Sequence, residues 1–205
     1  MTILTRLGKG TELTYTELDG NFTDLDTRTK SGWRDIVDHM QSRGGSSEPP
    51  YSLFRGNIWM PAFSHIDMQE CYAQFNIGHD YAMGTTLYPL IHWSVDTTTI
   101  GTVRWGFEYS IAKGHQQMAF TEPVTVYVNQ TTDGTIYKHY IAEIADADAI
   151  SGTLIEPDTI ILCRIFRDST NLSDNYDGHA FGICTSLHYQ ADKLTTINKK
   201  PNFFG

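Results

Sequence analysis

The eight histidines are the residues of this chain with the widest range of chemistry, because a neutral imidazole binds metal ions and exchanges protons near neutral pH. His92, His115, His139 and His188 lie in or beside predicted strands. No two histidines stand two apart or four apart, the spacings that turn two imidazoles toward one ion on a strand or a helix. We therefore predict no metal ligands within one chain, although one His92 per chain would supply three ligands around a threefold axis.

One predicted loop carries three aspartates, Asp168, Asp174 and Asp177. Oxygen-rich loops hold calcium, but these residues lack the ligand spacing and the final glutamate of an EF-hand, so we expect a solvated turn. In the same loop Tyr176 stands between Asn175 and Asp177. A tyrosine ring stacks on a sugar, while an amide and a carboxylate bond to its hydroxyls. Asn175, Tyr176 and Asp177 are therefore our candidate receptor loop.

The sequence carries little that indicates catalysis. It has no Gly-x-Ser-x-Gly elbow, no phosphate-binding glycine loop and no evident Cys/His pair. Distant strands could bring two carboxylates together, as in glycosidases, and Glu108 and Glu143 are the candidates. Both also fit solvent-facing strand positions. We predict a protein that is not an enzyme, with no catalytic residues and no cofactor.

The charge of the chain limits its partners. Its 205 residues include 24 acidic and 15 basic ones, for a formal net charge of −9. This charge repels phosphate backbones and anionic lipids, so we expect neither nucleic acid nor a membrane surface as a partner. No stretch approaches the roughly 18 apolar residues of a membrane span, and the first ten residues lack the apolar run of a signal peptide. We therefore expect synthesis and assembly in a cytoplasm.

The three cysteines, Cys71, Cys163 and Cys184, cannot all pair within one chain. None stands at the two-residue spacing of a zinc knuckle or a redox motif. We expect reduced thiols that form no covalent links.

Most of the chain after residue 50 has the alternating pattern of β-strands. Apolar and polar residues alternate over residues 103–111 and again over 181–189, which indicates strands with one buried face. An Asp133-Gly134 turn predicts a hairpin between two of the remaining strands. Those remaining strands are predicted at 71–77, 87–95, 124–130, 137–144 and 159–166. The fold class that follows is mainly β, an antiparallel β-sandwich or jelly roll.

The N-terminal region has a helical period instead. Thr14 followed by Glu17 has the form of a capping box at the start of a helix. The apolar residues form two stripes, the first of Leu18, Phe22 and Leu25 and the second of Trp33, Ile36, Val37 and Met40. Short amphipathic helices are marginal alone, so these apolar faces need a partner. We predict a short α-helical segment ahead of the sandwich.

A glycine-, serine- and proline-rich stretch lies between the two patterns, at residues 44–50. Glycine and serine make a chain flexible, and a proline pair stiffens its exit. We therefore predict a helical attachment or oligomerisation segment over residues 1–43, a hinge over 44–50 and a β-sandwich domain over 51–205.

Residues 8–22 carry the most specific motif. They read Gly-Lys-Gly-Thr-Glu-Leu-Thr-Tyr-Thr-Glu-Leu-Asp-Gly-Asn-Phe. This segment resembles one that opens many tail-fibre and related virion proteins of tailed bacteriophages, near the end that attaches to the tail. The resemblance, together with the first apolar stripe, implies an attachment role for a set of six residues, Thr14, Glu17, Leu18, Asn21, Phe22 and Leu25. Residues 85–115 and 186–203 also look like a β-rich region of phage structural proteins.

The resemblance implies a virion structural protein, assembled in the host cytoplasm. We predict a short tail- or collar-associated fibre that attaches by its N-terminus and contacts the host surface. Its expected partners are two further copies of itself, a tail, collar or head protein, and a host surface glycan. A homotrimer is expected because the aromatic-rich strands and narrow helical stripes need partner surfaces. The alternatives are a head fibre or capsid-decorating protein, a virion carbohydrate-active enzyme and a glycan-binding module.

Overall fold

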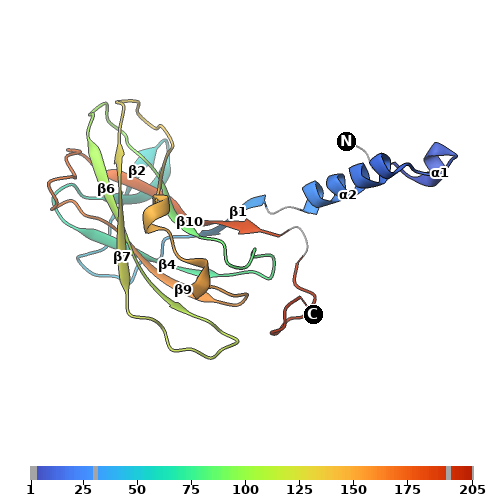
Figure 1. Cartoon of the computed structure of the whole chain (residues 1–205). Helices are drawn as coiled ribbons and strands as arrows, with labels where there is room; N and C mark the ends of the chain where they lie inside the picture. Colours follow the sequence, from blue (N-terminus) through green and yellow to red (C-terminus); the bar gives the residue numbers. More distant parts are fainter. Residues whose placement is uncertain (1–3, 30–31, 193–194, 205) are drawn as a thin grey trace.

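The computed structural model describes residues 4–29, 32–192 and 195–204, and it consists of two antiparallel sheets with a helical segment to one side (Figure 1). The six-stranded sheet contains β2 (Tyr51–Arg55), β3 (Ile58–Phe63), β10 (Ala180–Ala191), β5 (Tyr88–Ser94) and β8 (Tyr140–Glu143) in that order, with β1 (Gly32–Asp38) also paired to β10. The four-stranded sheet has the order β4 (Gln69–Asn76), β9 (Ile160–Arg167), β6 (Thr102–Ala112) and β7 (Val124–Thr131). The predicted mainly-β sandwich is confirmed.

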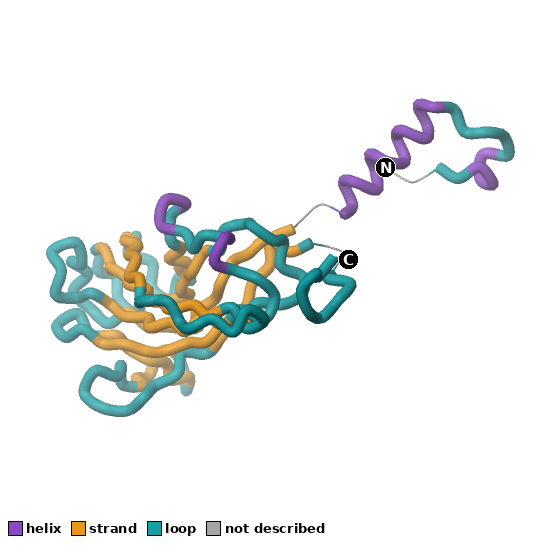
Figure 2. Tube along the Cα trace, turned by 60° about the horizontal axis from the view of Figure 1, so that its bottom comes forward, coloured by secondary structure: helices purple, strands orange, loops and turns teal. Residues whose placement is uncertain are grey.

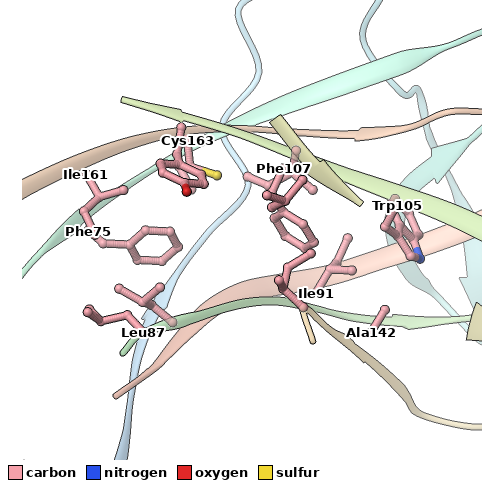
Figure 3. Packing of buried hydrophobic residues seen from close by; sticks show 14 of the residues in the cluster. Phe75, Leu87, Ile91, Trp105, Phe107, Ala142, Ile161 and Cys163 are labelled. Carbon is pink, nitrogen blue, oxygen red and sulfur yellow. The ribbon is translucent and has the colours of Figure 1, made fainter. Parts of the chain in front are cut away.

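The core lies between the sheets and consists of the side chains that alternate inward along each strand (Figure 3). Trp105 and Phe107 of β6 and Ile91 and Trp93 of β5 are fully buried. Trp93 packs against Trp105 at a ring-centroid distance of 5.8 Å, and it stacks on Tyr140 at 5.0 Å. Burial of each such side chain contributes about 1.5–3 kcal/mol to folding, so the period-2 alternation in the sequence supplies the main stabilisation of the sandwich.

The helical segment consists of α1 (Arg6–Lys9) and α2 (Tyr15–Thr29), and it extends away from the strands (Figure 1 and Figure 2). The predicted capping box is present at the start of α2. The Glu17 amide donates to Thr14 Oγ1 over 3.3 Å, and the Thr14 amide donates to Glu17 Oε2 over 2.8 Å. None of the described helices is both long and apolar enough to cross a membrane. Two short 3₁₀ helices, η1 (Asp146–Asp148) and η2 (Gly152–Leu154), lie in the loop before β9.

The second helical stripe is a strand, which corrects the prediction for that part of the chain. β1 pairs with β10 along its whole length, from Gly32 opposite Ala191 to Asp38 opposite Thr185. The β-branched Ile36 and Val37 favour a strand once a neighbouring edge is present, so tertiary pairing overrides the helical spacing. The N-terminal α-helical segment therefore ends with α2 at Thr29.

The expected boundary at residues 44–50 is also displaced. Met40, which precedes it, is buried in the sandwich core, and its side chain covers the backbone at Gly182. Gln41 forms an isolated bridge with Tyr72 of β4. Residues 32–41 thus belong to the sandwich, and the stretch 44–50 connects two parts of the same domain.

The predicted hairpin around Asp133-Gly134 does not form, because β7 and β8 belong to different sheets. β7 pairs with β6, and β8 pairs with β5. Asp133 instead accepts a hydrogen bond from the Tyr140 hydroxyl over 2.8 Å and pairs with Lys138. Asp133 and Gly134 therefore lie in the connection that leads from β7 in one sheet to β8 in the other. A hairpin absent from the prediction does form, from β2 to β3, through Gly56 with a φ of 60°.

Candidate functional site

A groove crosses the outer face of the six-stranded sheet. Register places Asp35 of β1 opposite His188 of β10, and His188 opposite Tyr88 of β5, so these side chains share one face. The inward neighbours of His188, Leu187 and Tyr189, are in the core, which puts this row on the outside. The groove has a volume of about 410 Å³ and is lined by Trp33, Asp35, Tyr88, Glu143, Asp146 and His188. We call it the Trp33 groove.

The Trp33 groove combines an open aromatic ring with held polar groups. Trp33 is 60% exposed and meets Tyr88 edge to face at a ring-centroid distance of 5.6 Å. The His188 imidazole lies between two carboxylates, with Asp35 at 2.6 Å from Nε2 and Glu143 in contact with Nδ1. These contacts hold the polar groups in place beside an apolar ring, the combination that small-molecule sites require.

The same face continues into a histidine pair. His92 Nδ1 lies 2.8 Å from His139 Nε2, and His92 Nε2 lies 3.0 Å from the Ser186 hydroxyl. Burial lowers the pKa of His92 from its ordinary value, and the neighbouring His139 lowers this pKa further. His92 is therefore held as a neutral hydrogen-bonding group beside the groove.

The outer face of the four-stranded sheet differs, because its aromatic rings are covered by arginines. The Arg104 guanidinium lies 4.0 Å from the centre of the Tyr127 ring, and that of Arg164 lies 4.3 Å from the Phe166 ring. Arg164 also pairs with Glu108 over 2.7 Å. This face has a hollow of about 420 Å³, but the rings that a sugar would need are occupied.

The structure separates the two carboxylates considered for catalysis. Glu108 lies on β6 in the four-stranded sheet, where it pairs with Arg164. Glu143 lies on β8 in the six-stranded sheet, where it contacts His188. Each has its own cationic or imidazole partner on a different sheet, so they do not form a pair around one bond.

The predicted receptor loop is not an exposed sugar-binding surface. Tyr176 is only 1% exposed, and its hydroxyl lies 2.9 Å from the Thr97 hydroxyl. The side-chain oxygen of Asn175 accepts a hydrogen bond from the Thr102 amide over 2.7 Å. Asp177 is exposed and lies 3.1 Å from His65. The ring of Tyr176 is therefore unavailable to a ligand, which corrects this prediction.

The aspartates of this loop have separate partners. Asp168 accepts from Arg104 Nε over 3.1 Å, and the buried Asp174 pairs with the fully buried Arg167 over 2.7 Å. The expected solvated turn is therefore wrong for Asp174. A buried arginine needs acceptors, and the loop folds around it to provide them.

Three of the six predicted attachment residues organise the helical segment. Glu17 pairs with Lys9 over 2.5 Å, and this contact, together with the Thr14 amide, lowers the pKa of Glu17 to about 2. The Asn21 side chain exchanges two hydrogen bonds with the backbone of Leu4, at 2.7 and 2.6 Å. Thr14, Glu17 and Asn21 therefore fold the preceding residues back onto α2.

The other three attachment residues form an apolar stripe on α2. Leu18 is 41% exposed, Phe22 is 62% exposed and Leu25 is 43% exposed. They follow one another at helical spacing, so they lie on one face of the helix. Their attachment role remains a prediction.

Sequence reasoning missed four residues of the Trp33 groove. Trp33 was assigned to a helical stripe, and Asp35, Tyr88 and Asp146 were not considered. Residues 33–38 read Trp-Arg-Asp-Ile-Val-Asp and do not alternate apolar with polar residues, so only the pairing with β10 shows that they form a strand.

The thiols are buried or half-buried. Cys71, Cys163 and Cys184 are all free thiols. Burial raises the pKa of Cys71 and that of Cys163 to about 12. Because the reactive form of a cysteine is the thiolate, these two thiols are unreactive at neutral pH.

No protein-family model and no curated protein matches the sequence. Among solved structures, the chain is similar to dimeric latent PorU from Porphyromonas gingivalis, with 9% identity and a TM-score of 0.29, covering 80% of this chain and 13% of that chain. It is also similar to TmCBM61 in complex with β-1,4-galactotriose, with 9% identity and a TM-score of 0.29, covering 82% of this chain and 94% of that chain. Similarities at this level carry no information about function.

Proposed function

We propose that this protein is a virion attachment protein whose N-terminal helices bind the particle and whose sandwich binds a neutral saccharide of the host surface. The observation that supports saccharide binding is the exposed Trp33 ring beside the carboxylate-flanked His188. The resemblance of residues 8–22 to phage fibre proteins and the exposed stripe of α2 support the attachment role. A tail- or collar-associated fibre and a head fibre both fit this arrangement.

The chemistry of the groove selects the class of saccharide. The indole of Trp33 presents an apolar surface to the C–H face of a sugar ring. Asp35, Glu143 and Asp146 line the groove and accept hydrogen bonds from hydroxyls. Three carboxylates and a net charge of −9 repel acidic sugars. We propose binding without hydrolysis, because Asp35 and Glu143, two of the carboxylates that line the groove, are both held by the His188 imidazole.

A saccharide-binding measurement tests this function. The purified full-length chain is titrated by calorimetry with neutral oligosaccharides and with sialylated ones. A ring that anchors a ligand contributes about 2 kcal/mol, so Trp33→Ala should raise Kd roughly thirtyfold. The matched control is Trp59→Ala, because Trp59 is 56% exposed but lies on β3, outside the groove.

Calorimetry reports affinity per site, so the comparison does not depend on how many chains assemble. Unchanged affinity in Trp33→Ala, or binding restricted to sialylated oligosaccharides, would contradict the proposed site.

We also propose that the chain assembles with copies of itself, as a homotrimer. β2 is the edge strand of the six-stranded sheet, and Tyr51, Leu53 and Trp59 lie on one face of the β2–β3 hairpin with more than half of each side chain exposed. An apolar edge of this kind favours association.

Light scattering of the full-length chain should give three times the chain mass of 23.2 kDa at micromolar concentration. Leu53→Lys places a charge in the apolar edge and should shift the mass toward that of one chain. Leu162→Lys on the four-stranded sheet, where Leu162 is 42% exposed, is the control and should not change the mass. A wild-type mass near 23.2 kDa would refute the oligomer.

A further inference from the structure

Two histidines and an aspartate from three separate loops converge beside the C-terminal segment. His79 follows β4, His115 follows β6 and Asp158 precedes β9. His115 Nε2 lies 2.8 Å from Asp158 Oδ2, and His79 Nε2 lies 3.3 Å from the same oxygen. One ligand atom from each residue lies within 4.8 Å of the other two. No other group of three such side chains is found in the described ranges 4–29, 32–192 and 195–204.

The spacing of these atoms suits a tetrahedral metal ion. Zinc binds imidazole nitrogen and carboxylate oxygen at about 2.0–2.2 Å, which places neighbouring ligand atoms about 3.3–3.5 Å apart. The separation of 3.3 Å from Asp158 Oδ2 to His79 Nε2 lies in this range, and that of 2.8 Å to His115 Nε2 is shorter. An ion could therefore enter with small side-chain movements.

A second contact fixes the orientation of one imidazole. His79 Nδ1 lies 2.6 Å from the Thr196 hydroxyl, so Nε2 is directed toward Asp158. Metal-binding histidines commonly use their second nitrogen in this way, which sets the tautomer that leaves the first nitrogen free to bind. Thr196 is therefore a positioning residue, because it orients the His79 imidazole without binding the ion itself.

The surroundings also favour a cation. Phe203 packs edge to face against both imidazoles, with ring centroids 6.0 Å from His79 and 5.3 Å from His115. Glu156, two residues before Asp158, is 4% exposed, and its Oε1 has no hydrogen-bond partner among the described residues. Glu156 and Phe203 line the same hollow. A buried carboxylate without full compensation is stabilised by a nearby positive ion.

We propose that His79, His115 and Asp158 bind one zinc ion, with a fourth position for water. Two imidazoles and one carboxylate suit zinc better than calcium or magnesium, which prefer oxygen ligands alone. The ion would join three loops of the sandwich, and through Thr196 and Phe203 it would fasten the C-terminal segment. This inference is independent of saccharide binding and of attachment to a virion.

Zinc titration of the metal-free full-length chain tests the site. The protein is stripped with a chelator, and zinc binding is followed by calorimetry and by elemental analysis of the dialysed complex. The expected result is one zinc per chain, with affinity at least a hundredfold weaker in His79→Gln and in His115→Gln. Thr196→Ala should weaken binding about 10–100-fold, because it removes the outer hydrogen bond only. Cobalt should give the absorption spectrum of a tetrahedral site.

The matched control is His188→Gln, since His188 also contacts two carboxylates but lies in the Trp33 groove. It should bind zinc as the wild type does. Asp158→Asn keeps the shape of the side chain and removes its charge, so it should weaken zinc binding without disturbing the fold. Circular dichroism checks the folding of every variant.

A second readout follows the C-terminal segment, where trypsin can cut after Lys199 but not after Lys200, because Pro201 follows it. Zinc should slow this cleavage in the wild type and leave it unchanged in His115→Gln. The proposal is overturned if the wild type retains no zinc. It is also overturned if the correctly folded His79→Gln and His115→Gln variants retain as much zinc as the wild type, or if zinc is lost only in His188→Gln.

Discussion

Replacing Arg167 by methionine is expected to lower the free energy of unfolding by about 3–5 kcal/mol, the usual cost of breaking a buried ion pair. Arg167 and Asp174 are 0% and 2% exposed in their side chains. The guanidinium donates to Asp174 Oδ1 over 2.7 Å and to Asp174 Oδ2 over 2.9 Å. It also donates to the backbone oxygens of Tyr176 at 2.5 Å and Gly178 at 2.6 Å. Its removal leaves the buried Asp174 carboxylate without a cation and with only backbone donation to Oδ2, from the Arg104 amide over 3.0 Å.

Urea unfolding of the wild type and the variant measures this change. If the free energy of unfolding falls with urea concentration at the same slope in both, the change appears as a shift in the transition midpoint. The control is Arg34→Met, because Arg34 is 58% exposed and its ion pair with Asp80 at 2.5 Å is worth no more than about 1 kcal/mol. Arg167→Met with Asp174→Leu should recover part of the loss, since much of the cost is the unpaired charge. Equal midpoints for Arg167→Met and Arg34→Met would show that the buried network does not stabilise the fold.

Replacing Leu18 and Phe22 by alanine is expected to lower the affinity for the virion by two or more decades. Each side chain contributes roughly 1.5–3 kcal/mol when a partner buries it fully, and every 1.4 kcal/mol is tenfold in affinity. Both are exposed in this chain, so thermal melting of the sandwich should not change. The measurement is the number of copies incorporated into particles, beside the melting temperature of the free protein.

Two controls separate attachment from folding. Thr16→Ala lies on α2 away from the stripe and should incorporate normally. Deleting residues 1–31 should abolish incorporation and leave melting unchanged, whereas deleting residues 1–43 also removes β1 and the core residue Met40 and should lower the melting temperature. Normal incorporation of the double variant would show that the stripe is not the attachment surface.

Local patterns in the sequence predicted the elements that depend on neighbouring residues. The alternation of apolar and polar residues over 103–111 and 181–189 predicted β6 and β10. Successive side chains of a strand point to opposite faces, so this local pattern is enough to indicate a strand with one buried face. The capping box of Thr14 and Glu17 predicted the start of α2, because its hydrogen bonds span only three residues.

The sequence alone did not place the residues whose environment depends on distant partners. Residues 33–40 have a helical spacing, yet β10, about 150 residues later, provides the edge that makes them β1. Tyr176 was expected to be an exposed loop tyrosine, but its ring packs in the core and its carbonyl accepts from the buried Arg167, a residue of β9.

The sequence by itself determined the mainly-β class, the period of the longest strands and the capped helix with its apolar stripe. Only the tertiary structure decided the two sites. The Trp33 groove needs β1, β5, β8 and β10 side by side, and the cluster of His79, His115 and Asp158 needs three loops to meet. Spacing along the chain carries no information about such contacts, because they are set by the pairing of strands far apart in sequence and by the packing of one sheet on the other.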